Sequence, residues 1–270
     1  MPHVPINGAR LYYEDRGSGP ETIVFAHGLL WSGYMFHNQI EALKQSYRCI
    51  TFDLRGQGKS EVTKEGYEIE RLYEDAVALI EKLKCTPCHF VGLSMGGFIG
   101  LRLGIRRPDL IKSLTLIESS ADPEAREAAR RYRMLSIIAR WIGLRIVADR
   151  VMEIMFGQKF LNDPERVKLK REWKERMVAN DRIGITRAVG GVIIREGVSD
   201  QLDRIKIPTL IIVGDQDVAT IPAKAEKMHA SIPNSKLVVI PGAGHTSTVE
   251  EPETVTAAMV EFLENQVEER

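Results

Sequence analysis

Short apolar segments alternate along this chain with longer segments whose apolar residues recur at helical spacing. The short segments are rich in Val, Ile and Phe and span 21–26, 48–52, 89–93, 112–117, 209–213 and 236–240. The longer segments span 67–84, 97–107, 223–231 and 252–267. Near-continuous apolarity is typical of strands buried on both faces, and strand–helix alternation produces a parallel sheet covered by helices. We therefore predict an α/β fold, with 9–15 as an additional edge strand.

This alternation stops between about residues 119 and 203, where we find no strand pattern and the apolar residues follow helical spacing. The segment is too apolar for a solvated linker, and it carries more Lys and Arg than Asp and Glu. We interpret it as a helical cap inserted into a core domain that comprises 1–118 and 204–270. The alternative is a set of ordinary helices that pack on the same core.

Size and charge narrow the class of protein. With 270 residues, the chain is near the upper limit for one hydrophobic core. It has 37 basic and 37 acidic side chains, so a nucleic-acid partner held by charge is not expected. No apolar run approaches the roughly 18 residues of a membrane span, and the N-terminus lacks an export-signal pattern. We expect a cytoplasmic protein without a membrane partner; its oligomeric state is not predicted.

A G-x-S-x-G motif centred on Ser94 lies directly between a predicted strand and a predicted helix. A nucleophilic serine needs a sharp turn that exposes its oxygen, and glycines at 92 and 96 leave room for that turn. The N-terminus of the following helix also offers backbone N–H groups to a developing anion. The alternative is a tight strand–helix turn that happens to contain a serine.

Two later loops supply the partners that a nucleophilic serine requires. Asp217 lies in an acidic loop after the predicted strand 209–213, and His245 lies in a glycine-rich loop after 236–240. A serine hydroxyl becomes a nucleophile when a histidine takes its proton and a carboxylate orients that histidine. The chain order is therefore serine, acid, histidine.

These motifs resemble those of the α/β-hydrolase fold family over nearly the whole chain outside the cap. The matching segments are His27-Gly28-Leu29, the stretch 53–60, the turn at Ser94, the Gly-x-x-Asp that ends at Asp217, and Gly244-His245. The resemblance implies a mostly parallel eight-stranded sheet with helices on both faces and an inserted helical cap. Relatives with aspartate in place of this serine, the haloalkane dehalogenases and epoxide hydrolases, have activities that we do not expect here.

The resemblance also implies roles for individual residues. Ser94, Asp217 and His245 would form a catalytic triad, and the backbone N–H groups of Leu29 and Met95 would form an oxyanion hole. Two other acids stay open as partners of the histidine: Asp215, two residues before Asp217, and Glu118, at the end of another predicted strand. His27 is expected to shape its loop.

Large apolar residues of the cap and of the loop after His27 are candidates for the substrate pocket, namely Trp31, Met35, Met134, Trp141 and Phe156. The alternative for each of them is an ordinary position in the hydrophobic core. A group of cap arginines could attract an anionic substrate or form a solvated helix face; it comprises Arg126, Arg130, Arg131 and Arg133.

Cys85 and Cys88 form a C-x-x-C-H pattern with the next residue, which is also found at covalent haem sites, redox sites and zinc sites. No second cysteine pair completes a zinc tetrad, because Cys49 stands alone. We read these cysteines as two thiols at a helix–strand turn and expect no metal and no cofactor.

The function expected from these features is that of a serine hydrolase that cleaves a small carboxylic ester through an acyl-enzyme. A lactonase similar to the 3-oxoadipate enol-lactonases, which act on an anionic substrate, is the main alternative. Carbon–carbon bond hydrolases and cofactor-free perhydrolases share the same triad. A ligand receptor of the same fold is the alternative from another class, and turnover would distinguish it.

Overall fold

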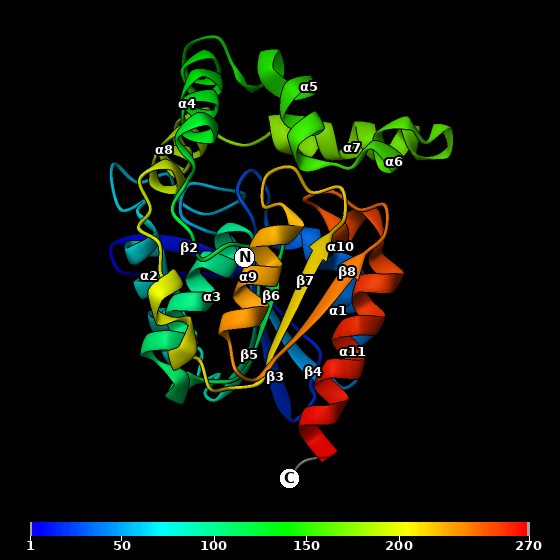
Figure 1. Cartoon of the computed structure of the whole chain (residues 1–270). Helices are drawn as coiled ribbons and strands as arrows, with labels where there is room; N and C mark the ends of the chain where they lie inside the picture. The colour runs from blue at the N-terminus through cyan, green and yellow to red at the C-terminus, as the bar shows by residue number, and fades with distance from the viewer. Residues whose placement is uncertain (1, 269–270) are drawn as a thin grey trace.

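An eight-stranded sheet forms the centre of the computed structural model, which describes residues 2–268 and the side chains as far as residue 265 (Figure 1). Its strands in chain order are β1 (His3–Ile6), β2 (Ala9–Arg16), β3 (Glu21–Ala26), β4 (Tyr47–Phe52), β5 (Cys88–Leu93), β6 (Ile111–Ile117), β7 (Thr209–Gly214) and β8 (Ser235–Ile240). The spatial order is β1-β2-β4-β3-β5-β6-β7-β8. β2 runs antiparallel to both β1 and β4, and the remaining neighbours are parallel.

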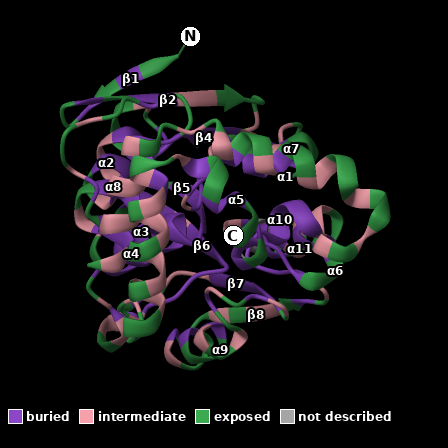
Figure 2. Ribbon diagram, turned by 90° about the horizontal axis from the view of Figure 1, so that it is seen from above, coloured by how far each residue is buried: buried purple, intermediate pink, exposed green. Residues whose placement is uncertain are grey.

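Helices cover both faces of this sheet. α2 (Ile69–Lys82), α3 (Met95–Arg106) and α9 (Pro222–Ser231) cover one face, while α1 (His37–Leu43) and α11 (Pro252–Glu268) cover the other. Each face has its own apolar cluster, and successive strand residues alternate between the two clusters, as Phe25 and Ala26 do in β3. Seen from above, the buried residues follow the strands and α3 (Figure 2). The sheet is therefore a rigid base that fixes where each strand ends.

Five α-helices lie between β6 and β7 in the sequence. They are α4 (Arg126–Trp141), α5 (Leu144–Met155), α6 (Gln158–Asn162), α7 (Val167–Val178) and α8 (Arg182–Ile193). Figure 1 shows this group above the carboxyl ends of the parallel strands. In open parallel sheets, ligands bind outside those strand ends. The inserted helices therefore form a roof over the position where a site is expected.

The predicted fold class is confirmed, and the predicted elements occur close to their expected bounds. Every predicted strand lies within one residue of its observed ends, and every predicted helix within two. β1 and α1 were not predicted, because a four-residue strand and a seven-residue helix are too short to show a clear periodicity. Residues 1, 269 and 270, which the predicted core domain includes, lie outside the described residues.

No helix within residues 2–268 is both long enough and apolar enough to cross a lipid bilayer.

Candidate active site

Ser94 occupies a strained turn between β5 and α3. Its backbone has φ 50° and ψ −107°, in the left-handed region that residues with a side chain rarely adopt. The turn is held because the Ser94 N–H donates to the carbonyl of Ile117 at 2.8 Å. A Cβ on Gly96 would lie 1.9 Å from the carbonyl oxygen of Ala26, so only glycine fits there. This local geometry brings the Ser94 hydroxyl to the carboxyl end of the sheet.

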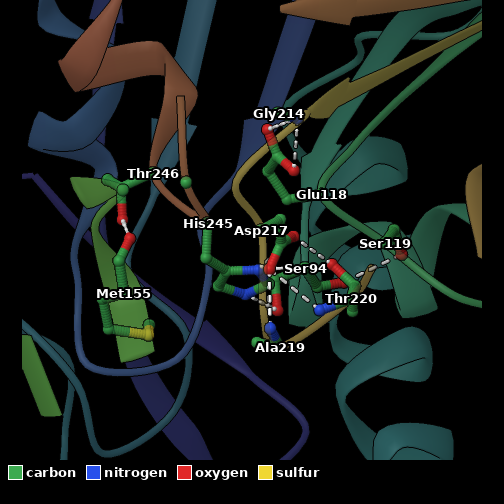
Figure 3. A network of polar contacts seen from close by, with 12 residues as sticks. Ser94, Glu118, Ser119, Met155, Gly214, Asp217, Ala219, Thr220, His245 and Thr246 are labelled. Carbon is green, nitrogen blue, oxygen red and sulfur yellow. Dashed lines mark hydrogen bonds and ion pairs between the residues drawn. The ribbon is translucent and has the colours of Figure 1, made fainter. Parts of the chain in front are cut away.

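His245 lies in the loop after β8 and reaches Ser94 across 151 residues of sequence (Figure 3). The Oγ of Ser94 lies 2.9 Å from Nε2 of His245, within hydrogen-bond distance for transfer of the hydroxyl proton. Both side chains are buried beneath the helical roof. A base and a nucleophile are therefore already in contact in this structure.

Asp217, in the loop after β7, accepts a hydrogen bond from Nδ1 of His245 at 2.8 Å. Three other donors fix the same carboxylate: the N–H groups of Ala219 and Thr220, and the Thr220 hydroxyl at 2.6 Å. Burial by itself would raise the pKa of Asp217, but the imidazole and these hydrogen bonds outweigh it and hold that pKa below its ordinary value. Asp217 is therefore an ionised carboxylate positioned to stabilise a protonated imidazole.

The two alternative acids make other contacts. Asp215 accepts a hydrogen bond from the N–H of Gly242 at 2.7 Å and so joins the loops after β7 and β8. Glu118 is fully buried and accepts from the N–H of Gly214. Burial and the nearby charge of Asp217 raise its pKa well above the ordinary value. The structure thus brings Asp217 into contact with the imidazole, and Glu118 lies next to Asp217.

Glu250 also contributes to the site, although no motif in the sequence points to it. It ends α10 (Ser247–Glu250) and is buried, and its carboxylate accepts hydrogen bonds from the N–H groups of Gly244 and Thr246, on either side of His245. The same carboxylate accepts from the N–H of Gly157 in the cap at 2.8 Å. Burial raises the pKa of Glu250 to about 7. One side chain therefore joins the histidine loop to the cap.

The residues predicted to supply the oxyanion hole flank Ser94. Met95 follows Ser94 as the first residue of α3, and Leu29 lies in the loop after β3 and lines the same cavity as Ser94 and His245. His27 makes structural contacts, because its Nε2 accepts from the Leu54 N–H at 2.8 Å. Burial lowers the pKa of His27, which favours the neutral imidazole. These contacts fit the expected loop-shaping role.

A cavity of about 100 Å³ opens beside Ser94 and His245. Its walls are mainly apolar side chains of the cap, including Leu135 and Ala139 from α4, Leu144, Val147 and Val151 from α5, and Ile185 and Val189 from α8. Phe98 of α3 closes the cavity on the core side. The volume adjoining the nucleophile is therefore suited to an apolar group.

None of the residues predicted for the pocket lines this cavity, and Trp31, Met35 and Phe156 instead occupy the hydrophobic core, which was the alternative for them. Met134 and Trp141 lie on the outer side of α4, with 57% and 78% of their surfaces exposed. Trp31 and Phe156 are buried and pack edge to face at 5.9 Å, away from the cavity lining. Helical spacing identified apolar positions, but it did not show which side of each helix faces the core.

The cap arginines also lie elsewhere. Arg126, Arg130 and Arg133 are exposed on α4, and Arg131 lies over the ring of Tyr132 at 5.3 Å. All four are absent from the cavity lining. The positions of Arg126, Arg130 and Arg133 fit the alternative of a solvated helix face, whereas Arg131 is half-buried beside Tyr132.

The cysteines of the C-x-x-C-H pattern are both buried thiols. Burial raises the pKa of Cys85 to about 11 and raises that of Cys88 further, so neither thiol is readily ionised. A cluster of side chains that can bind metal ions lies in the active site itself. It comprises Glu118, Asp217 and His245, and one nitrogen or oxygen atom from each lies within 4.8 Å of the others. Both ring nitrogens of His245 are engaged by Asp217 and Ser94, so these groups form a chain for proton transfer.

The site has a buried serine, histidine and aspartate, joined by hydrogen bonds at the carboxyl ends of parallel strands. This arrangement is the catalytic triad of a class of hydrolases. The family model described as "alpha/beta hydrolase fold" matches residues 21–252. The chain belongs to the α/β-hydrolase fold family.

Several members of this family are similar to the chain over most of its length. The 3-oxoadipate enol-lactonase 1 of Acinetobacter baylyi is 32% identical over 239 residues, which cover 87% of each chain. The structure of a thermophilic esterase from Thermogutta terrifontis, with malate bound, has a TM-score of 0.91 at 28% identity and covers 98% of this chain and 99% of its own. The enol-lactonase of Burkholderia xenovorans has a TM-score of 0.90 at 28% identity, covering 97% and 99%.

Proposed function

We propose that this protein is a serine hydrolase that cleaves carboxylic esters through an acyl-enzyme intermediate. The observation that supports this most directly is the continuous hydrogen-bonded chain from Ser94 through His245 to Asp217, with both distances below 3.0 Å. Such a chain lets the imidazole accept a proton while the aspartate stabilises the resulting positive charge. The esterase and enol-lactonase relatives support the same class of reaction.

In the first half of the proposed reaction, Oγ of Ser94 attacks the ester carbonyl carbon and its proton passes to Nε2 of His245. The N–H groups of Met95 and Leu29 stabilise the negative oxygen of the tetrahedral intermediate. The carbon–oxygen bond to the leaving alcohol then breaks, and His245 returns the proton to that alcohol. The products are a free alcohol and an acylated Ser94.

In the second half, a water molecule gives a proton to His245 and attacks the acyl carbon. Breakdown of this second intermediate releases the carboxylic acid and returns the proton to Ser94.

The direct test is labelling with a fluorophosphonate probe, followed by peptide mapping, together with p-nitrophenyl acetate hydrolysis. We expect the label on Ser94 and a burst of nitrophenol equal to the enzyme concentration. A protein that binds such ligands but shows neither label nor turnover would be a receptor, and this result would overturn the proposal.

A lactonase activity is the second candidate, because the Acinetobacter baylyi relative is an enol-lactonase. A lactone is an intramolecular ester, so the same residues would act and the alcohol would remain attached to the acid product. A panel of simple lactones and linear esters, compared by kcat/KM, decides between the two.

A further inference from the structure

The charged groups near the cavity indicate which acyl groups it accepts. Among the residues that the structure describes, the lining includes only one carboxylate, Glu124, and no lysine or arginine. Glu124 lies in the segment that enters the cap, just before α4, and its side chain is 6% exposed. A buried carboxylate at this position requires a counter-charge.

Arg195, directly after α8, supplies that counter-charge from behind the cavity wall. Its Nη1 donates to Glu124 at 2.6 Å and to the carbonyl of Val192 at 3.0 Å. Its guanidinium lies 4.2 Å from the centre of the Phe98 ring, which itself lines the cavity. The arginine is therefore engaged by Glu124 and screened by Phe98.

Phe98 connects this ion pair to the helix that begins after Ser94. The Phe98 N–H donates to the Ser94 carbonyl, so the ring that covers Arg195 is one helical turn from the nucleophile. Tyr132 lies in the same wall, where burial, followed by the charge of Glu124, raises its pKa. A substrate that fills the cavity therefore meets mainly hydrocarbon, and the one carboxylate in the lining, Glu124, is already paired with Arg195, so no cation among the described lining residues is free to bind a second carboxylate.

We propose that Glu124, held by Arg195, restricts the substrate to esters whose acyl group is uncharged and apolar. The inference rests on the proposed function and makes it more specific. A carboxylate at the far end of an acyl chain would lose its water in an apolar cavity and meet the like charge of Glu124. The cavity thus differs from one built for the dicarboxylate skeleton that the name 3-oxoadipate denotes.

The test compares three p-nitrophenyl esters of matched chain length with the wild-type protein. They are the hexanoate, the adipate monoester with a free terminal carboxylate, and the same adipate capped as its methyl ester. We expect kcat/KM for the hexanoate to exceed that for the free adipate by about 100-fold or more, because a carboxylate is costly to desolvate. We expect the methyl-capped ester to recover at least tenfold over the free acid, which separates charge from length.

Glu124→Gln removes the charge while keeping an oxygen that can accept from Arg195. We expect the ratio of hexanoate to free adipate to fall by about tenfold or more, because the arginine becomes the nearest net charge. Glu124→Ser is a second uncharged variant, to be used if the glutamine variant does not fold. Glu127→Gln, an exposed glutamate of α4 outside the cavity, is the matched control, and we expect its ratio to equal that of the wild type.

Equal hydrolysis of the free adipate and the hexanoate by the wild type would overturn this inference and leave the proposed function intact. The same holds if the ratio is unchanged in Glu124→Gln. Failure of all three esters, with no phosphonate label on Ser94, would instead remove the proposed function itself.

Discussion

The core and the cap supply different parts of the candidate site. Ser94, Asp217 and His245 all follow core strands, whereas most of the cavity wall comes from helices α4, α5 and α8. Strand ends are fixed by the hydrogen-bonded ladders of a buried sheet, whereas the helices above them are outside those ladders. The core holds the reactive groups, and the cap forms most of the wall that contacts the substrate. Substitutions in the cap can therefore change which substrate binds without changing the reaction.

The largest effect is expected when two serines that line the same cavity are compared, Ser94 from the core and Ser136 from the cap. Ser94→Ala removes the nucleophile, and we expect ester hydrolysis to fall by about 10⁵-fold or more with folding retained. Ser136→Ala, on the cap helix α4, is expected to change kcat/KM by less than about threefold. Initial rates with p-nitrophenyl esters and circular dichroism spectra measure both. Comparable losses in the two variants would contradict the assignment of chemistry to the core.

A second test concerns Glu250, where core and cap meet. Because burial raises its pKa to about 7 from an ordinary 4.5, the folded state holds a proton that the unfolded state releases between these pH values. The contribution of Glu250 to stability is therefore greatest below about pH 4.5. It falls as the pH rises to about 7, by roughly 3 kcal/mol.

Glu250→Gln has no such titration, so its free energy of unfolding should depend less on pH in this range. Chemical denaturation of both proteins from pH 4.5 to 8 gives the slope of the free energy of unfolding against pH for each, and the two slopes can be compared. Parallel pH profiles would show that Glu250 titrates normally.

A cap substitution in the cavity should alter substrate preference without abolishing reaction. Ile185 of α8 is buried and lines the cavity, so Ile185→Phe would shorten the space for the acyl chain. We expect kcat/KM for hexanoate to fall by about tenfold relative to acetate, with a stability cost of about 1–3 kcal/mol from overpacking. An unchanged preference would place the acyl group elsewhere.

The smallest effect is expected on the outer side of the cap. Trp141 is 78% exposed, so Trp141→Ser should change stability by no more than about 0.5 kcal/mol and kcat/KM by less than about twofold. Thermal unfolding and hexanoate kinetics measure these. A marked loss of activity would restore Trp141 as a pocket residue.

The sequence predicted the core well because the relevant signals are local. A glycine-flanked turn after an apolar run identified the position of Ser94, and similar strand ends identified Asp217 and His245. Parallel strands then bring residues that are distant in sequence to one edge. The contact between Ser94 and His245 was therefore predictable without knowledge of the cap.

The cap residues could not be predicted in the same way. Met134 and Leu135 are adjacent apolar residues of α4, yet only Leu135 lines the cavity. Which one turns inward depends on how α4 packs on α8 and α5, and that information is not local. Glu250 was missed for a related reason: its partners are backbone N–H groups, and their residue types do not show that a carboxylate will bind them.

Close main-chain contacts join the cap to the core at two glycines, Gly184 of the cap and Gly244 of the core. A Cβ on Gly184 would lie 1.9 Å from the carbonyl oxygen of Gly56, and one on Gly244 would lie 2.2 Å from the nitrogen of Gly157. Main chain therefore rests directly on main chain where α8 and the α5–α6 connection meet the core. A side chain at Gly184 or Gly244 would force these chain segments apart, so the close seating of the cap on the core depends on glycine at both points.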